Sequence, residues 1–258
     1  MDGRLSHYGT RPLLDIKEEF RNMNIIIIGA TSGIGKALFE KYATNGNHIG
    51  IVGRRTHLLD ELRQQYPGRT FTATVDITKQ EEVNAIRNLC TQIGHVDLAI
   101  VCSGTGEINP TLDYALERPT LDTNVTGWTY VIDMFFHLFE QQEHGHLVAI
   151  TSAGGLRGEP MAPAYSATKA YQINYMEALR KKAFKAGGKI IVTDIRPGLV
   201  NTAMAKGEGH FWMMPVEKVA SQISAAIRKR KSKVYVTKRW HVLAIINKNL
   251  PFTLYKRM

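Results

Sequence analysis

Short apolar runs alternate with longer amphipathic stretches along most of this chain, and this alternation restricts the fold more than any other feature. Seven runs have the length and the Ile, Val and Leu content of buried strands: 24–29, 48–53, 70–75, 98–101, 146–151, 189–195 and 233–237. Six stretches have helical periodicity: 33–45, 57–66, 79–93, 111–141, 162–186 and 215–230. Strands that alternate with helices pair in parallel through right-handed crossovers. The pattern predicts one doubly wound α/β domain, with a parallel sheet of about seven strands and helices on both faces.

The charge is concentrated at one end of the chain. The 258 residues hold 33 Lys and Arg against 23 Asp and Glu, a formal net charge of +10. Glu217 is the last acidic residue, and the 41 residues after it contain eleven basic ones. The first 217 residues are therefore nearly neutral. A protein that coats nucleic acid spreads its cations over the fold, so nucleic-acid binding is disfavoured.

The remaining composition narrows the class and the compartment. A hydrophobic content of 44% and a charged content of 22% are those of a folded domain rather than a disordered chain. Cys90 and Cys102 form no disulfide or metal-ligand pattern, which indicates a reducing compartment such as the cytoplasm. No apolar run approaches the length of a transmembrane helix. We expect an N-terminal extension over residues 1–22, the α/β domain over 23–239 and a basic, apolar tail over 240–258.

A glycine-rich loop follows the first predicted strand and opens the first predicted helix. Gly29, Gly33 and Gly35 have the spacing Gly-x-x-x-Gly-x-Gly, with Thr31, Ser32 and Ile34 between them. Such a loop brings backbone N–H groups and a helix N-terminus close to a pyrophosphate. Its place after the first strand predicts a Rossmann-like nucleotide site.

The residues after the second predicted strand bear on the choice of cofactor. An acidic residue at this point would bind the ribose 2′-hydroxyl of NAD, but the chain has Arg54 and Arg55, and no carboxylate before Asp60. A guanidinium can bind a 2′-phosphate through two hydrogen bonds. We therefore expect NADP(H) in preference to NAD(H), with Arg54 as the first residue to test. The alternative is that both arginines are solvated loop charges.

Four polar residues form a candidate catalytic group. Tyr165 and Lys169 are four residues apart in a predicted helix, so they share one face of it. A nearby ammonium lowers the pKa of a phenol, which makes the phenol a usable acid or base. Ser152 follows the fifth predicted strand, and Asn124 lies further upstream. By itself the Tyr–Lys spacing is also found in ordinary surface helices.

Together, these motifs resemble the short-chain dehydrogenase/reductase family in order and spacing, over about residues 24–237. The resemblance implies that Tyr165 is the general acid or base, that Lys169 lowers its pKa and binds the nicotinamide ribose, and that Ser152 binds the substrate oxygen. It implies that Asn124 supports a proton relay through water to Lys169. It also implies further cofactor contacts: Asp76 and Ile77 near the adenine, Cys102, Ser103 and Gly104 near the ribose, and Pro197, Gly198, Val200 and Thr202 near the carboxamide.

The sequence departs from the family pattern at two positions. Ile28 stands where the family commonly has Thr, and Cys102 where it has an Asn that braces the sheet. The change at Cys102 puts local rigidity in doubt. The thiol is either buried and inert or sensitive to oxidation.

Several other features have more than one interpretation. His144 and His146 are spaced like a metal pair but have no third ligand nearby in the sequence, so no metal is expected. Residues 199–214 correspond to a substrate lid in the family, and their Met and aromatic residues either bind an apolar carbonyl compound or fill gaps. Apolar residues on more than one face of the 111–141 and 162–186 helices indicate a homodimer or homotetramer, as the resemblance also implies.

The tail and the function itself also leave alternatives open. The tail either docks on the body or on a partner subunit, or rests on an anionic membrane surface. The leading functional hypothesis is an NADP(H)-dependent oxidoreductase acting on a carbonyl and alcohol pair. A non-catalytic NADP(H) sensor is the main alternative, and a sugar-nucleotide epimerase or dehydratase is a more distant one.

Overall fold

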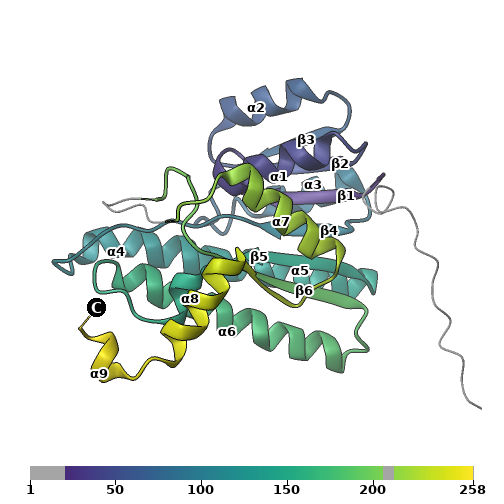
Figure 1. Cartoon of the computed structure of the whole chain (residues 1–258). Coiled ribbons are helices and arrows are strands. Elements are labelled where there is room, and N and C mark those ends of the chain that lie inside the picture. Colours follow the sequence, from purple (N-terminus) through teal and green to yellow (C-terminus); the bar gives the residue numbers. More distant parts are fainter. Residues whose placement is uncertain (1–20, 206–211, 258) are drawn as a thin grey trace, which may run out of the picture.

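A seven-stranded parallel sheet forms the centre of the molecule (Figure 1). The computed structural model describes residues 21–205 and 212–257. The strands are β1 (Asn24–Ile28), β2 (His48–Gly53), β3 (Thr70–Thr74), β4 (Leu98–Val101), β5 (Gly145–Ile150), β6 (Ile190–Pro197) and β7 (Lys233–Val236). Their order is β3-β2-β1-β4-β5-β6-β7, and every neighbouring pair is parallel. The predicted doubly wound fold is confirmed, and all seven predicted strands are present.

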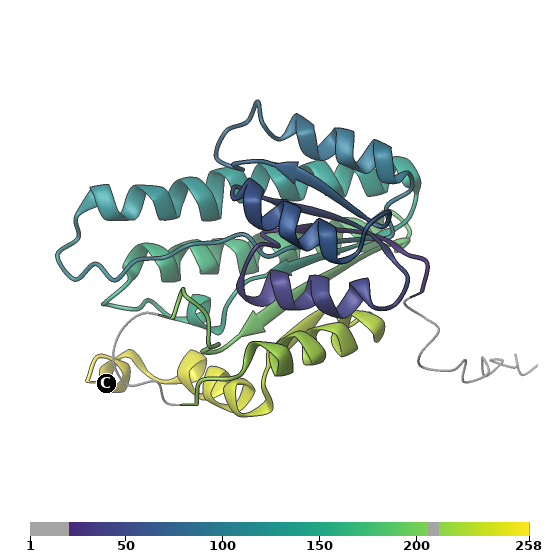
Figure 2. The same cartoon turned by 90° about the horizontal axis from the view of Figure 1, so that it is seen from above.

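Helices cover both faces of the sheet (Figure 2). One face packs against α1 (Gly33–Ala43), α2 (Thr56–Gln65) and α7 (Val216–Arg228). The other packs against α3 (Asn84–Ile93), α5 (Trp128–Gln142) and α6 (Pro163–Lys185). Strands buried on both sides need apolar residues in succession, which explains the four consecutive isoleucines of β1. The order of the strands reverses between β1 and β4, and ligands of such sheets bind at the carboxyl edge near this point.

The long helix predicted over 111–141 is interrupted, which corrects the prediction. α4 (Tyr114–Leu121) is followed by a π-helical segment, η1 (Asp122–Gly127), and then by α5. Pro119 lies inside α4 and cannot donate an internal hydrogen bond. The wider turn of η1 contains Asn124, so the interruption lies at a predicted catalytic residue. The helix predicted over 79–93 also begins later, at Asn84, because turns occupy the preceding residues.

The C-terminal tail is helical and docked on the body. α8 (Lys238–Asn249) and α9 (Phe252–Tyr255) lie at the same end of the molecule as α4 (Figure 1). α8 contacts β7 and η2, a short 3₁₀ segment over Ala153–Leu156. Most of the expected N-terminal extension lies outside the described residues. Within residues 21–205 and 212–257, no helix combines the length and the apolar character that crossing a bilayer requires.

Candidate active site

The glycine-rich loop forms a tight turn between β1 and α1. A Cβ at Gly35 would lie 2.1 Å from the carbonyl oxygen of Gly29, so only glycine fits there. α1 begins at Gly33 and directs its N-terminus toward the carboxyl edge of the sheet. Thr202, from the segment after β6, packs on the same turn, 3.2 Å from where a Gly33 Cβ would stand. The turn therefore has the backbone geometry for an anion at the start of a helix.

Arg55 is held against the same loop. Its guanidinium donates to the hydroxyl of Thr31 at 2.6 Å and to that of Ser32 at 2.7 Å. Arg54 points elsewhere and lies 3.9 Å from the carboxylate of Asp76, with a largely exposed side chain. Both arginines are thus at the edge of the loop, but Arg55 is the one positioned by loop side chains.

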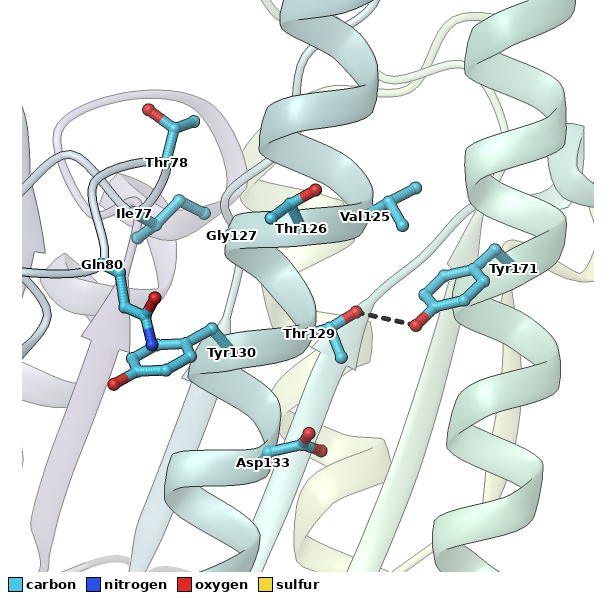
Figure 3. Close-up of a pocket in the computed structure, with 10 residues that line it drawn as sticks. All are labelled: Ile77, Thr78, Gln80, Val125, Thr126, Gly127, Thr129, Tyr130, Asp133 and Tyr171. Carbon is cyan, nitrogen blue, oxygen red and sulfur yellow. Dashed lines mark hydrogen bonds between the residues drawn. The ribbon is translucent and has the colours of Figure 1, made fainter.

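The residues after β3 form the neighbouring part of the site. Burial raises the pKa of Asp76, but hydrogen bonds from Thr78 and the charges of Arg54 and Lys79 outweigh it, and the net pKa lies below the ordinary value. A hollow of about 500 Å³ beside Asp76 is lined by Arg54, Thr78 and residues of α4 and η1. A second hollow, of about 350 Å³, is lined by Ile77, by residues of η1 and α5, and by Tyr171 of α6 (Figure 3).

Ser152, Tyr165 and Lys169 come together as the sequence predicts. Ser152 follows β5, and its hydroxyl accepts a hydrogen bond from the N–H of Gly154 at 3.0 Å. Burial raises the pKa of Tyr165 above its ordinary value, and a hydrogen bond with Ser152 partly offsets this. Lys169 Nζ lies 5.8 Å from the centre of the Tyr165 ring. The resemblance implies that Lys169 lowers the pKa of Tyr165. In the structure, the net pKa of Tyr165 instead lies above its ordinary value, because burial is the largest effect.

Gln172 joins Lys169 to Asn124, a link that the sequence analysis missed. Lys169 Nζ donates to Oε1 of Gln172 at 2.9 Å, and Nε2 of Gln172 donates to the carbonyl oxygen of Asn124 at 2.8 Å. The Asn124 side chain is occupied elsewhere: it donates to the carbonyl of Thr105 and accepts from the N–H of the same residue. Gln172 and Asn124 are both fully buried. The signal was a glutamine three residues after Lys169, on the buried face of α6.

Among the described residues, Lys169 is a buried cation that contacts no ion-pair partner. It is 3% exposed, and its other hydrogen bond goes to the Ile150 carbonyl at 3.3 Å. Burial lowers its pKa to about 8, although Asp194 and Cys102 act to raise it. Asp194 is itself paired with Arg196 at 2.7 Å, and Thr151 donates to it at 2.6 Å. This network ties the ends of β5 and β6 together beneath the catalytic residues.

The segment after β4 lies between the phosphate loop and the catalytic residues. A Cβ at Gly104 would stand 3.2 Å from Lys169 Nζ and 3.4 Å from Oδ1 of Asn124. Ser103 contacts Gly29 of the loop. Burial raises the pKa of the Cys102 thiol to about 12, so it is an unreactive thiol, and its N–H continues the pairing with β1.

The tail reaches the segment after β6, which the sequence did not indicate. The ring of Trp240 lies where a Cβ of Gly198 would be, 2.0 Å from that point. Trp240 also donates to the carbonyl of Trp212, and the Arg239 guanidinium lies over the Trp212 ring. Pro197 ends β6, and Val200 pairs with Met214. The described part of the predicted lid is therefore held by the tail, and residues 206–211 lie outside the described ranges.

His144 and His146, the two histidines with metal-like spacing, lie in different surroundings. His146 is buried beside Thr193, and burial lowers its pKa to about 4. His144 contacts His95 next to Asp97, at the amino edge of the sheet. The rings of His95 and His144 are stacked with an angle of 18°, and the donor atoms of His95, Asp97 and His144 lie within 4.8 Å of one another.

The apolar residues that indicated a subunit contact lie largely in the chain's own core. Val131, Phe135, Phe136, Phe139 and Met176 are all at most 1% exposed and belong to the core between the sheet and its helices. The homo-oligomer thus stays a prediction that rests on family resemblance.

Comparisons with known proteins identify the family. The model of the short chain dehydrogenase family matches residues 23–211. An uncharacterized oxidoreductase of Mycobacterium tuberculosis is 31% identical over 222 residues, covering 82% of this chain and 87% of its own length. Another, from Staphylococcus epidermidis, is 29% identical over 185 residues, covering 70% and 80%.

Solved structures share the fold. A short chain dehydrogenase of Burkholderia cenocepacia in complex with NADP superposes with a TM-score of 0.80 at 20% identity, covering 92% of this chain and 98% of the other. One of Burkholderia phymatum in complex with NAD has a TM-score of 0.78, also at 20% identity, covering 89% and 94%. On its sequence match and its fold together, the chain belongs to the short chain dehydrogenase family of oxidoreductases.

Proposed function

We propose that this protein is an NADP(H)-dependent oxidoreductase that interconverts a carbonyl and an alcohol. The observation that carries the proposal is the meeting of Ser152, Tyr165 and Lys169 at the carboxyl edge of the sheet, beside a glycine loop built for a pyrophosphate. A protein that only bound a nucleotide would need the loop but not the three polar side chains. The relative from Burkholderia cenocepacia, crystallised with NADP, has the same fold.

The residues present fit a nicotinamide cofactor. Gly29, Gly33 and Gly35 allow the tight turn at the start of α1, and Gly104 lets the backbone after β4 pass close to Lys169. Arg54 and Arg55 supply positive charge where a 2′-phosphate would be recognised, and Ser32 already binds Arg55. The remaining predicted contacts are Asp76, Ile77, Ser103, Pro197, Gly198, Val200 and Thr202. When bound, such a cofactor supplies or accepts a hydride, which is chemistry that no side chain offers.

The proton chemistry falls to this chain's own residues. Ser152 holds the substrate oxygen near the Tyr165 hydroxyl, and Tyr165 gives its proton to that oxygen in reduction or takes one from it in oxidation. Lys169 supports the phenolate that remains. Gln172 holds Lys169 in place and connects it to the Asn124 carbonyl. In the proposed relay, the proton that Tyr165 donates is replaced from this side, through Lys169.

Tyr165 is protonated at neutral pH, as the acid in carbonyl reduction must be. Because burial raises its pKa, the phenol is protonated there and is ready to donate. We infer an apolar carbonyl substrate, because Leu199, Met204 and Trp212 are partly exposed in the lid segment. The two free cysteines suit a reducing compartment, and we place the protein in the cytoplasm.

Turnover of a panel of aldehydes and ketones with NADPH and NADH tests the proposal. We expect reduction of at least one apolar carbonyl compound, faster with NADPH, and a loss of about 10²–10⁴-fold in kcat for Tyr165→Phe. Binding of NADPH without turnover of any member would favour the alternative, a non-catalytic sensor. Full turnover by Tyr165→Phe would reject the assignment of the acid.

A further inference from the structure

The helix α8 has apolar side chains on two opposite sides, and only one of them is covered. On the inner side, Ala244 is buried and Trp240 packs on Gly198. Arg157 fixes the helix from below, by donating to the carbonyl of Asn247 at 2.9 Å and to that of Leu250. These contacts account for docking on the body, which was one of the two interpretations of the tail.

The outer side remains open to solvent. Val242, Ile245 and Ile246 follow one another at helical spacing and are 58%, 49% and 54% exposed, and Phe252 and Leu254 of α9 are 68% and 51% exposed. We call these five residues the outer face. Large apolar side chains grouped in this way on one short segment are characteristic of a surface that meets another apolar phase or a partner.

The charged side chains of the tail itself are all positive. Arg239 and Lys248 are exposed on α8, Lys256 and Arg257 are exposed directly after α9, and no acidic residue follows Glu217 in the chain. Salt bridges elsewhere on the surface, such as that of Lys189 with Glu143, neutralise cations locally. On α8 and α9 no carboxylate of their own is available to do so.

We propose that the outer face docks on an anionic lipid surface. Apolar side chains insert among the lipids while adjacent cations meet the headgroups, and the two effects together give stable yet reversible binding. A second copy of the chain fits less well, because a two-fold contact through this face would bring the same cations of both copies together. Since α8 packs against η2, directly after Ser152, docking also holds the end of the sheet that carries Ser152 near the membrane, and its catalytic meaning rests on the proposed function.

Sedimentation with vesicles tests this proposal on the full chain. We expect the protein to sediment with vesicles of phosphatidylglycerol and phosphatidylcholine, to be released as salt is raised, and to remain in solution with phosphatidylcholine alone. The triple change Lys248→Glu, Lys256→Glu and Arg257→Glu should reduce binding at least about tenfold. The matched control, Lys181→Glu, Lys185→Glu and Lys229→Glu, reverses three exposed cations elsewhere and should bind like the wild type.

A second pair of variants tests the apolar part of the face. Phe252→Ser should weaken vesicle binding, whereas Phe184→Ser, which removes an even more exposed phenylalanine from the end of α6, should not. Circular dichroism and thermal unfolding confirm that each variant is folded.

Three results would overturn the proposal. One is wild-type protein that stays in solution with phosphatidylglycerol vesicles, and another is an equal loss of binding in both triple variants. The third is a dimer in analytical ultracentrifugation that Phe252→Ser dissociates, since the face would then be a contact between copies. None of these readouts depends on enzyme activity, so they stand apart from the proposed reaction.

Discussion

The two ends of the candidate cofactor cleft hold their cations in opposite ways. At the loop end, Arg54 and Arg55 are exposed; Arg54 lies near Asp76, and Arg55 donates to two hydroxyl groups. At the catalytic end, Lys169 and Arg196 are 3% and 4% exposed. An exposed cation costs the fold little, whereas a buried one must be satisfied by the surrounding structure. Substitutions at the loop end should therefore change ligand binding alone, and those at the catalytic end should also change stability.

The strongest test of this difference is Arg196→Ala. It leaves Asp194 buried without its ion-pair partner and removes a hydrogen bond to Tyr235 at 2.9 Å. Loss of one partner from a buried pair costs about 3–5 kcal/mol. We expect the free energy of unfolding in urea to fall by this amount, while Arg54→Ala, the exposed control, changes it by less than about 0.5 kcal/mol. Equal effects would remove the basis of the comparison.

Lys169→Met separates the catalytic role of a buried cation from its cost to the fold. We expect kcat to fall about 10²–10⁴-fold, because Tyr165 loses the cation that stabilises its phenolate. A methionine has similar length and no charge, so the variant should remain folded. Retention of full activity would exclude Lys169 from the mechanism.

The difference in stability between Lys169→Met and the wild type should depend on pH. Lys169 has a pKa of about 8 in the folded protein against an ordinary value of 10.5, so between these values the unfolded chain holds a proton that the folded protein lacks. The free energy of unfolding of the wild type therefore rises with pH between about pH 8 and pH 10.5. Below pH 8 the wild type bears the full cost of a charged lysine in a buried position. The stability of Lys169→Met relative to wild type should fall by about 3 kcal/mol between pH 7 and pH 10.5. Unfolding in urea at both values measures it.

The loop end was more predictable from the sequence than the catalytic end, and the reason is physical. The turn at Gly29 and Gly35 is encoded by neighbouring residues, and so is the alternation that specifies the sheet. The contacts of Gln172 with Asn124 and of Trp240 with Gly198 join residues 48 and 42 positions apart, which no local pattern contains. The interruption of the helix at η1 was only partly predictable. Pro119 and Gly127 indicate it, but the apolar periodicity continues through it.

At the loop end, Arg54→Asp and Arg55→Ala test cofactor choice. A hydrogen bond to a charged group contributes about 1.5–3 kcal/mol. We therefore expect KM for NADPH to rise about 10–100-fold and KM for NADH to change little, with unfolding free energies near that of the wild type. Lys41→Ala, an exposed cation in the last turn of α1, is the control. An equal rise in both KM values would contradict NADP(H) preference.

Gln172 offers the finest test, because it acts only through Lys169 and Asn124. Gln172→Leu removes both hydrogen bonds, and we expect kcat to fall about tenfold, with a smaller change in KM, since the side chain is fully buried and bonds to Lys169 and Asn124. Gln172→Glu keeps the shape but places a carboxylate next to Lys169, which raises the lysine pKa above about 8. The fall of kcat at alkaline pH, which we attribute to deprotonation of Lys169, should therefore move to higher pH in this variant. A residue that merely fills space would leave that fall of kcat unmoved in both variants, and such a result would show that the catalytic end works without the Gln172 link.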